Sequence, residues 1–129
     1  MANPFVVQLK NEPGAMATLA ETLAARGVDL RAIGGGGIGD AGHVIMTTAD
    51  DDTTRQVLDE GGYTYIEGES ILAEVDDRPG GMAALARQLA DAGVNIYGHL
   101  FLGRWGDRAM FAFVVDRPDV ARPILERKG

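Results

Sequence analysis

The sequence contains one short stretch twice, first as Asn11-Glu12-Pro13-Gly14-Ala15-Met16 and again as Asp77-Arg78-Pro79-Gly80-Gly81-Met82. The likeness continues without insertion through residues 16–28 and 82–94, where Met, Leu, Ala, Gly and Val recur at matching positions. A regular repeat in a chain of 129 residues indicates two copies of one supersecondary unit. We therefore expect two small domains, residues 1–69 and 70–129, that depend on each other for stability.

The composition excludes several classes of protein. Hydrophobic residues make up 46% of the chain and charged residues 24%, which is typical of a globular domain. The chain has no Cys, so disulfides, thiolate nucleophiles and thiolate metal sites are excluded. A formal charge of −7 argues against a nucleic-acid partner. The N-terminal residues have neither the basic start nor the apolar segment of a signal peptide, and no run could span a membrane, so we expect a cytoplasmic protein.

The first copy predicts six elements in order. The apolar residues 5–9 favour a strand, which ends at the Pro13-Gly14 turn. The next segment predicts an amphipathic helix that ends at Gly27, with its apolar face formed by Met16, Leu19, Ala20 and Leu23. Strands follow over residues 28–33 and 43–48, joined by a glycine-rich turn. The Asp50-Asp51-Asp52 run caps a short helix, and residues 63–66 favour a fourth strand.

The second copy follows the same order up to its last helix. Strands are expected over residues 70–75, 95–102 and 109–115, with a turn over residues 103–107. Pro118 and Pro123 fall in the segment that matches the short helix, so we expect this helix to be frayed or kinked. Gly129 matches Tyr63, so the last strand is expected to be missing. This would leave an open sheet edge, and pairing with a second chain predicts a homodimer.

In this order the elements form the split βαβ plan, and the residues resemble the ACT domain, a small amino-acid-sensing fold. More closely, they resemble bacterial proteins that consist of two ACT domains. The shared features are a polar residue before Pro-Gly, a Met that opens an amphipathic helix, and Gly-Val-Asp/Asn leading into the next strand. The resemblance covers nearly the whole chain. It implies an α+β fold of two ferredoxin-like βαββαβ repeats with antiparallel sheets, the second lacking its last strand.

The resemblance also implies a binding site for an amino acid where two ACT domains meet. One domain supplies the loop between its first strand and first helix, and its neighbour supplies the start of its second strand. Helix N–H groups left unpaired after the Pro-Gly turn favour an α-carboxylate. The implied ligand-binding residues are Asn11, Gly14, Ala15 and Met16 with Asn95 and His99, and Asp77, Gly80, Gly81 and Met82 with Asp29.

The two implied sites differ in charge. If the domains exchange contacts about a pseudo-twofold axis, Asn11 meets Asn95, whereas Asp77 meets Asp29. Two carboxamides can serve both the carboxylate and the ammonium group of an amino acid. Two carboxylates repel a carboxylate and favour a cation, or share a proton. The first site is therefore expected to bind an amino acid, and the second to be weak or empty.

Simpler interpretations stay open for several of these residues. Pro-Gly is also an ordinary strand-to-helix turn, Asp29 and Asn95 can serve only to end a helix or begin a strand, and His99 can be a hydrogen-bonded strand residue. The glycines at positions 34, 36 and 39 match the dinucleotide fingerprint, but a strand follows them instead of a helix. The two His residues lack metal-ligand spacing. No metal or cofactor is predicted.

Together these features favour a non-enzymatic, amino-acid-binding regulatory protein that acts through a partner chain. One alternative is a docking subunit of an amino-acid biosynthetic enzyme that works without a ligand. Another is a cofactor-free oxygenase of the dimeric ferredoxin-like barrel type. That class requires an aromatic-lined cavity, whereas aromatic residues make up only 6% of this chain and no acid/base pair is evident.

Overall fold

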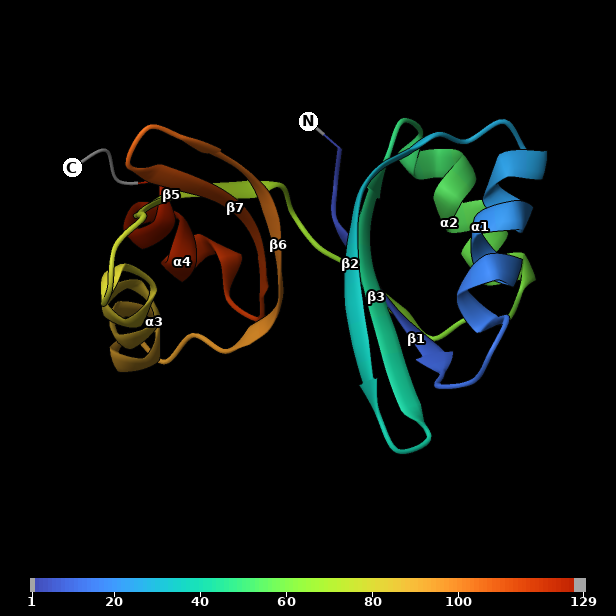
Figure 1. The fold of residues 1–129 in the computed structure, drawn as a ribbon, viewed down its shortest axis with the longest axis horizontal. Coiled ribbons are helices and arrows are strands. Elements are labelled where there is room, and N and C mark those ends of the chain that lie inside the picture. The colour runs from blue at the N-terminus through green and yellow to red at the C-terminus, as the bar shows by residue number, and fades with distance from the viewer. Residues whose placement is uncertain (1, 127–129) are drawn as a thin grey trace. The chain divides into compact units, whose positions relative to one another are not determined.

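The computed structural model describes residues 2–126, which divide into two compact units between Gly68 and Glu69. The first unit contains β1 (Phe5–Lys10), α1 (Ala15–Ala25), β2 (Leu30–Ile38), β3 (Ala41–Thr48), α2 (Asp51–Glu60) and β4 (Tyr65–Glu67). Its four strands pair in the antiparallel order β2-β3-β1-β4. Both helices cover the same face of this sheet (Figure 1).

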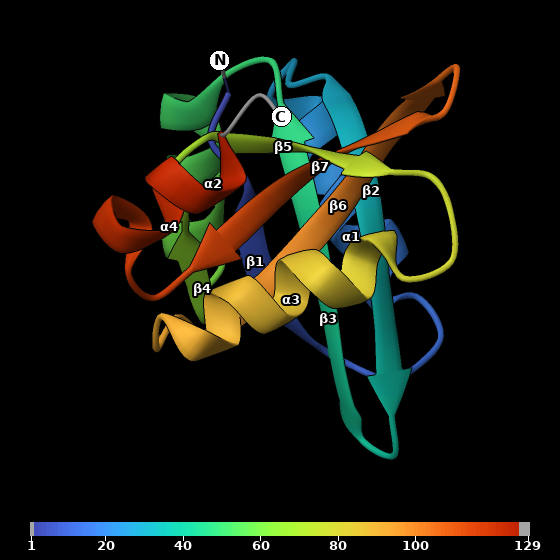
Figure 2. The same cartoon turned by 90° about the vertical axis from the view of Figure 1, so that its left-hand side faces the viewer.

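The second unit repeats this plan with one strand fewer. It contains β5 (Ile71–Asp76), α3 (Gly81–Asp91), β6 (Ile96–Trp105), β7 (Arg108–Val115) and α4 (Pro118–Leu125). The three strands pair in the antiparallel order β5-β7-β6, and α3 and α4 lie on one face of the sheet (Figure 2). Within residues 2–126 the count of seven strands and four helices confirms the predicted class of two ferredoxin-like repeats, the second without its last strand. Gly129, which matches Tyr63, lies outside the described residues.

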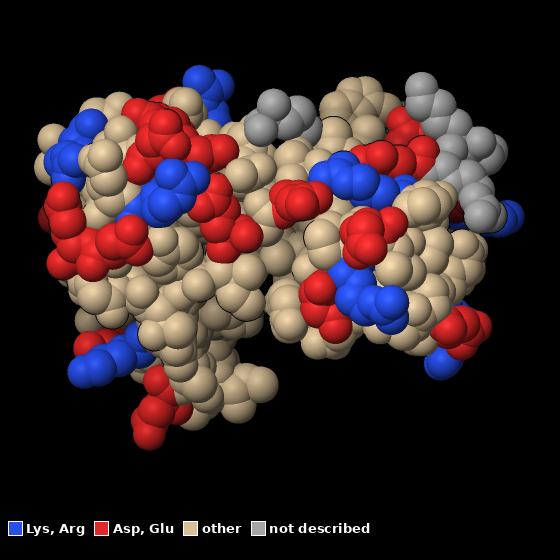
Figure 3. All heavy atoms as spheres, turned by 180° about the vertical axis from the view of Figure 1, so that it is seen from behind, with Lys and Arg blue, Asp and Glu red and all other residues tan. Residues whose placement is uncertain are grey.

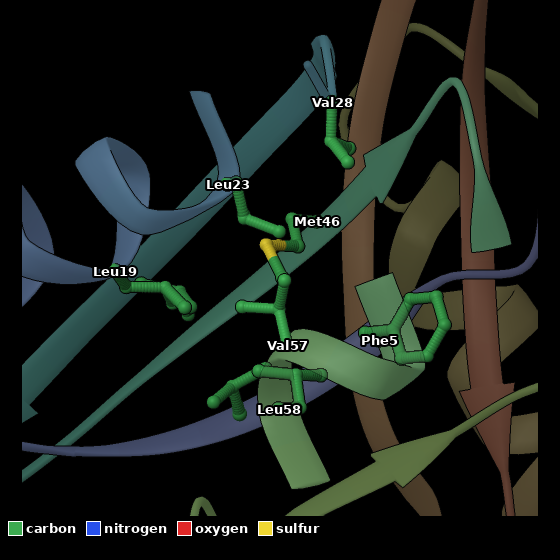
Figure 4. Packing of buried hydrophobic residues seen from close by; sticks show 9 residues of the cluster. Phe5, Leu19, Leu23, Val28, Met46, Val57 and Leu58 are labelled. Carbon is green, nitrogen blue, oxygen red and sulfur yellow. The ribbon is translucent and has the colours of Figure 1, made fainter. Parts of the chain in front are cut away.

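Alternating strand residues and one face of each helix build the core of the first unit. Phe5 and Val7 of β1 point to the same side of the sheet, because side chains alternate along a strand. They meet Leu19 and Leu23 of α1, and all four side chains are buried (Figure 4). Met46 of β3 and Val57 and Leu58 of α2 complete this layer. Of the predicted helix face, Met16 is the exception, with 48% of its surface exposed.

The second unit buries an equivalent cluster. Its members come from the strands, α3 and α4: Ile71, Ala73, Leu89, Val94, Phe113, Val115, Ala121 and Leu125. Pro118 stands at the first position of α4, where its missing N–H costs nothing. Pro123 is accommodated inside this helix, and α4 ends at Leu125, two residues later.

The predicted turn between the second and third strands was too long in both units. The glycines at 34–37 are part of β2, and the pairing with β3 continues to Ile38 opposite Ala41, so the turn contains only Gly39 and Asp40. In the second unit β6 continues to Trp105, which pairs with Arg108. The prediction failed because glycine carries no side chain and gives no alternating apolar signal, although its backbone pairs like that of any other residue.

Charged side chains of both signs are intermixed on the surface (Figure 3). The best-formed ion pair joins α2 to β4: Arg55 donates through Nε to Glu67 Oε1 at 2.7 Å and through Nη2 to Oε2 at 2.9 Å. This contact lowers the pKa of the Glu67 carboxyl, which also accepts a hydrogen bond from Asn3. None of the described helices is long and apolar enough to cross a membrane.

Candidate functional site

The turn between β1 and α1 adopts a conformation that requires glycine. Gly14 has φ 89° and stands at the N-cap of α1, and Gly80 has φ 88° at the N-cap of α3. This left-handed region is readily accessible only to glycine. Gly81 is also constrained, because a Cβ atom there would lie 2.1 Å from the backbone oxygen of Asp76. The two turns thus share the conformation of the N-cap glycine but differ at the next residue, which is Ala15 in the first unit and Gly81 in the second.

The turns leave fewer free amide groups than the sequence suggested. The Ala15 N–H donates to Glu12 O at 3.4 Å, and the Gly81 N–H donates to Arg78 O at 3.1 Å. These contacts correct the expectation that both amides of each pair are available to a ligand. Among residues 2–126, no hydrogen-bond partner is found for the N–H groups of Met16 and Met82.

Asn11 fastens the β1–α1 loop to the end of the β2–β3 hairpin. Its Nδ2 donates to Gly39 O at 2.9 Å, and its backbone N–H donates to Asp40 O at 3.1 Å. The side-chain amide lies directly against Gly37, where an added Cβ would be 2.7 Å from Asn11 Cγ. Position 37 therefore has to be small for Asn11 to keep this orientation.

A hollow of about 380 Å³ opens beside Asn11, between the start of α1 and the β2–β3 hairpin. Its volume falls in the range of small-molecule sites. Mostly apolar side chains and glycine backbone line it: Leu9, Asn11, Met16, Ile33, Gly34, Gly35, Gly36, Gly37, Gly42, His43 and Val44. Gly35 and Gly37 lie on the helix side of β2, opposite Val44 and Gly42, so their missing side chains leave room there.

The glycine run, Ile33 and His43 were absent from the predicted site. The signal was present in the sequence, because four consecutive glycines in a strand point to a close approach or a space that side chains would fill. The glycines were interpreted as a turn, so they were not expected to lie on the same sheet face as Leu9.

The second unit has a hollow of about 360 Å³ at the equivalent place, but its lining is charged. Asp77, Arg78, Pro79 and Met82 of the loop take part, together with Arg104 of β6. The strand registers show how the lining differs. In the first unit, Gly35 pairs with Val44 and Gly37 pairs with Gly42. At the equivalent positions of the second unit, Phe101 pairs with Phe111 and Arg104 pairs with Ala109. Phe101 and Arg104 therefore take the places of the two glycines.

Arg104 neutralises the carboxylate that distinguishes the second loop. Its Nε donates to Asp77 Oδ2 at 2.7 Å, and its guanidinium carbon lies 4.9 Å from the centre of the Phe101 ring. A guanidinium group held by a carboxylate and an aromatic face is well satisfied. The second hollow thus already contains a positive and a negative group of its own. This role of Arg104 was not predicted, because residues 103–107 were expected to form a turn.

The predicted residues at the strand starts lie away from the loop of their own unit. The Asp29 carboxylate pairs with Arg31 at 3.1 Å. The Asn95 N–H donates to Asp116 Oδ1 at 2.8 Å, and no hydrogen bond of its side-chain amide is found in the described part of the chain. His99 is exposed on β6, with ring centres of Phe111 and Phe113 each 6.2 Å away. The structure therefore joins Asn11 with Met16 and Asp77 with Met82, but places His99 outside both hollows.

Two other motifs have structural explanations. Asp50 is the N-cap of α2 and accepts the Thr53 N–H at 3.0 Å, and the hydrogen bonds from Thr53 lower the pKa of this carboxyl. No cluster of three or more His, Asp or Glu residues suited to a metal occurs within residues 2–126. The glycines of the apparent dinucleotide fingerprint lie in a β-hairpin and do not open a helix, as the sequence context predicted.

Comparison with known proteins identifies the fold. No protein-family model and no curated protein matches the chain. Among solved structures, the chain is similar to protein BT0572 from Bacteroides thetaiotaomicron, with a TM-score of 0.71 and 19% identity over 97% of this chain and 86% of that one. It is also similar to the regulatory subunit of aspartate kinase from Thermus thermophilus, with a TM-score of 0.58 and 18% identity over 97% and 89%.

A similar subunit from Thermus flavus gives a TM-score of 0.59 and 18% identity over 98% of this chain and 92% of that one. At these identities the likeness concerns the fold. It spans nearly the full length of the chain, including both repeats. In its fold, the chain is similar to these proteins, and it consists of two ferredoxin-like repeats in tandem, the fold that its resemblance to ACT domains implied.

Proposed function

We propose that the chain is a regulatory protein without catalytic activity of its own, and that its first unit binds a free amino acid. The observation that carries this proposal is the hollow of about 380 Å³ beside Asn11. It combines an apolar lining, a side-chain amide and the unpaired N–H of Met16 at the start of α1. An α-carboxylate suits such an N–H, and a carboxamide can accept from an ammonium group while donating to a carboxylate.

The differences between the units support one site in preference to two. The hollow of the second unit is occupied on one side by Arg104 and Asp77, which satisfy each other. An amino acid binding there would have to compete with this pair for both of its charged groups. Binding at the first hollow requires no such exchange.

The resemblance to ACT domains adds a second contributor, the start of the second strand of a neighbouring unit. In our proposal this is Asn95, whose side-chain amide is exposed. Its backbone is held by Asp116 through Asn95 N–H to Oδ1 at 2.8 Å and through Asp116 N–H to Asn95 O at 3.1 Å. Replacing Asn95 by Ala removes the amide and leaves both backbone bonds, so it tests this contribution alone.

Regulation through a partner fits the similar structures, which include regulatory subunits of aspartate kinase. We propose that the output of this chain likewise passes to a separate catalytic chain. Its partner would sense the change in the first unit when the ligand binds.

The proposal is tested by a thermal-shift screen of the purified protein against the twenty proteinogenic amino acids at millimolar concentration. A ligand at ~100 times its Kd stabilises the folded state by about 2.7 kcal/mol, which raises Tm by several degrees. Hits are then measured by calorimetry on Asn11→Ala and on Asp77→Ala, a matched pair at equivalent loop positions. We expect Asn11→Ala to weaken binding at least about tenfold, the effect of losing ~1.4 kcal/mol, and Asp77→Ala to bind like the parent protein.

A flat screen with a well-folded protein would overturn the ligand proposal and favour a docking subunit that works without a ligand. If Asp77→Ala abolished binding while Asn11→Ala did not, the ligand would occupy the second hollow instead.

A further inference from the structure

Two large apolar side chains are left exposed at the hollow beside Asn11. Met16 of α1 exposes 48% of its surface and Ile33 of β2 exposes 40%, and both residues line the hollow. The β2–β3 hairpin extends past the helices that cover the rest of the sheet (Figure 1). In the second unit, by contrast, Met82 is partly buried against the core. The first hollow thus offers apolar surface that a ligand can cover.

The side chains that line the hollow are apolar, with one exception. Side chains alternate along a strand, and Gly42 and Val44 lie on the helix side of β3, so the His43 side chain points to the other face. His43 therefore lines the hollow through its backbone. Among the lining residues, all within 2–126, no side chain carries a carboxylate, ammonium or guanidinium group. The Asn11 amide is the single polar side-chain group of this described lining.

The floor of the hollow is glycine backbone and is also poor in polar groups. The N–H and C=O groups of a strand lie in the plane of its sheet, so the face of the sheet presents mainly Cα atoms. Position 35 cannot carry a side chain without a shift of the backbone, because a Cβ there would lie 2.4 Å from His43 O. A charged group resting on this floor would lose its hydration without gaining a partner. An apolar group would lose nothing.

The polar and apolar parts of the hollow are separated along β2. Asn11 lies against Gly37. Ile33 is four residues earlier, which is about 13 Å along the strand at ~3.3 Å per residue. A ligand side chain that starts beside Asn11 must therefore extend over Gly35 to reach Ile33.

The second unit shows which kinds of group fill the two parts. Phe101 has the register position of Gly35, and its ring centre lies 5.5 Å from that of Phe111. The charged groups, Arg104 and Asp77, pair with each other at the loop. An uncharged apolar group over the strand and charged groups at the loop are also the two parts of an apolar amino acid.

We propose that the first hollow selects an amino acid with an uncharged aliphatic side chain, of the size of valine, leucine, isoleucine or methionine. This inference rests on the proposed function, since it concerns the amino acid that binds in this hollow. The charged groups of the ligand bind the Asn11 amide and the Met16 N–H. Its side chain packs on Gly35 and contacts Ile33.

The lining favours an aliphatic side chain over an aromatic one. Val44 stands opposite Gly35, where the second unit has Phe111 opposite Phe101. Pairs of aromatic rings gain stability beyond the area that they bury, but the described lining of the first hollow contains no ring that a ligand ring could meet in this way. An alkyl group gains there what its buried area provides.

The first test is a homologous series of ligands. Calorimetric titration of the full chain with alanine, 2-aminobutyrate, norvaline and norleucine lengthens the side chain by one methylene at a time. Each methylene that enters an apolar site improves the affinity about fourfold, so Kd should fall steadily along the series. Aspartate has the same branching as leucine but carries a charge, and it should bind at least about tenfold more weakly than leucine.

The second test compares two isoleucines of nearly equal exposure. Ile33→Ser removes an apolar wall of the hollow. Ile66→Ser is the matched control, because Ile66 is 41% exposed on β4 and does not line the hollow. We expect Ile33→Ser to weaken leucine binding at least about fourfold and to leave alanine binding unchanged, because the methyl group of alanine does not reach Ile33. Ile66→Ser should bind both ligands like the parent protein, and circular dichroism confirms that each variant is folded.

Asn11→Ala separates this inference from the proposed function. It acts on the charged groups that all members of the series share, so it should weaken every member by a similar factor and keep their order. If no amino acid binds to the parent protein, the proposed function fails and the aliphatic class fails with it. Binding that Asn11→Ala weakens, but that is equal along the series or tighter for aspartate or phenylalanine than for leucine, overturns the aliphatic class alone.

Discussion

The absence of two side chains in β2 distinguishes the two hollows at the scale of single residues. Gly35 and Gly37 carry no side chains toward the hollow beside Asn11, whereas Phe101 and Arg104 stand at the same register positions in the second unit. The unit with Asn in the loop thus has Gly in the facing strand, and the unit with Asp in the loop has Arg there. The Pro-Gly turn, which makes the repeat visible in the sequence, has the same N-cap glycine conformation in both units and does not decide which hollow is open.

Replacing Gly37 by Ala tests the importance of this space. The new Cβ would lie 2.7 Å from Asn11 Cγ, so the amide must move and lose its hydrogen bond to Gly39 O. Only the end of a flexible side chain is displaced, so we expect little change in the free energy of unfolding and a loss of amino-acid affinity of about tenfold. Calorimetric titration measures the affinity, and urea unfolding measures the stability.

Gly36→Ala is the matched control. The backbone of Gly36 lines the hollow, but side chains alternate along a strand, so its Cβ would point to the other face of β2, where it meets nothing within 4 Å. It should keep the affinity of the parent protein and be as stable or slightly more stable, since alanine restricts the unfolded chain. Equal losses of affinity in both variants would mean that β2 itself, and not the room for Asn11, governs binding.

At the scale of elements, the order of strands and helices could be predicted because each copy carries its own periodic signals. Leu19 and Leu23 marked the buried face of α1, and Asp50 marked the start of α2. The length of β2 could not be predicted, because Gly34 to Gly37 have no side chains to alternate. The pairing of Arg104 with Asp77 depends on the extra residue that shifts the register of β6 after Phe101, which no local pattern reveals.

The ion pair between α2 and β4 predicts a specific response to acid. Arg55 lowers the pKa of Glu67 in the folded protein, so the charged carboxylate stabilises the fold at pH values above the ordinary Glu pKa. This contribution is lost as the pH falls through the lowered pKa of Glu67 and the carboxylate takes up a proton. We expect Glu67→Gln to reduce the free energy of unfolding near pH 7 and to make its decline below about pH 4.3 shallower.

Glu60→Gln serves as the control for this prediction. Glu60 pairs with Arg26 at 3.1 Å, but its side chain is 68% exposed, so solvent screens the contact. Urea unfolding at a series of pH values should show parent-like behaviour for Glu60→Gln. An acid response of Glu67→Gln that equals that of the parent protein would contradict the assignment of the pH dependence to Glu67.

At the scale of the whole molecule, each chain carries a formal charge of −7, and two copies repel each other. A homodimer formed by pairing of sheet edges, as the sequence predicts, depends on backbone hydrogen bonds, and these do not require an attraction between opposite charges to offset the repulsion. Added salt screens it, since the Debye length shortens from about 30 Å at 0.01 M to about 10 Å at 0.1 M ionic strength.

We therefore expect the dimer to become tighter as salt is added. Analytical ultracentrifugation between about 0.01 M and about 0.1 M NaCl should show the dissociation constant falling several-fold. A dissociation constant that rises with salt would mean that ion pairs between the copies hold the dimer together.

In the second unit, the Arg104–Asp77 ion pair takes the place that the charged groups of a ligand would need, so this unit resembles a ligand-bound unit at all times. A sensor with one vacant site per chain responds to its ligand along a simple hyperbola, with a Hill coefficient near 1, when the sites of different chains bind independently. Duplication of an ACT unit would ordinarily create the means for a steep, switch-like response. If the first unit binds an amino acid as proposed, the filled second copy would suit the chain to a graded response to amino-acid concentration.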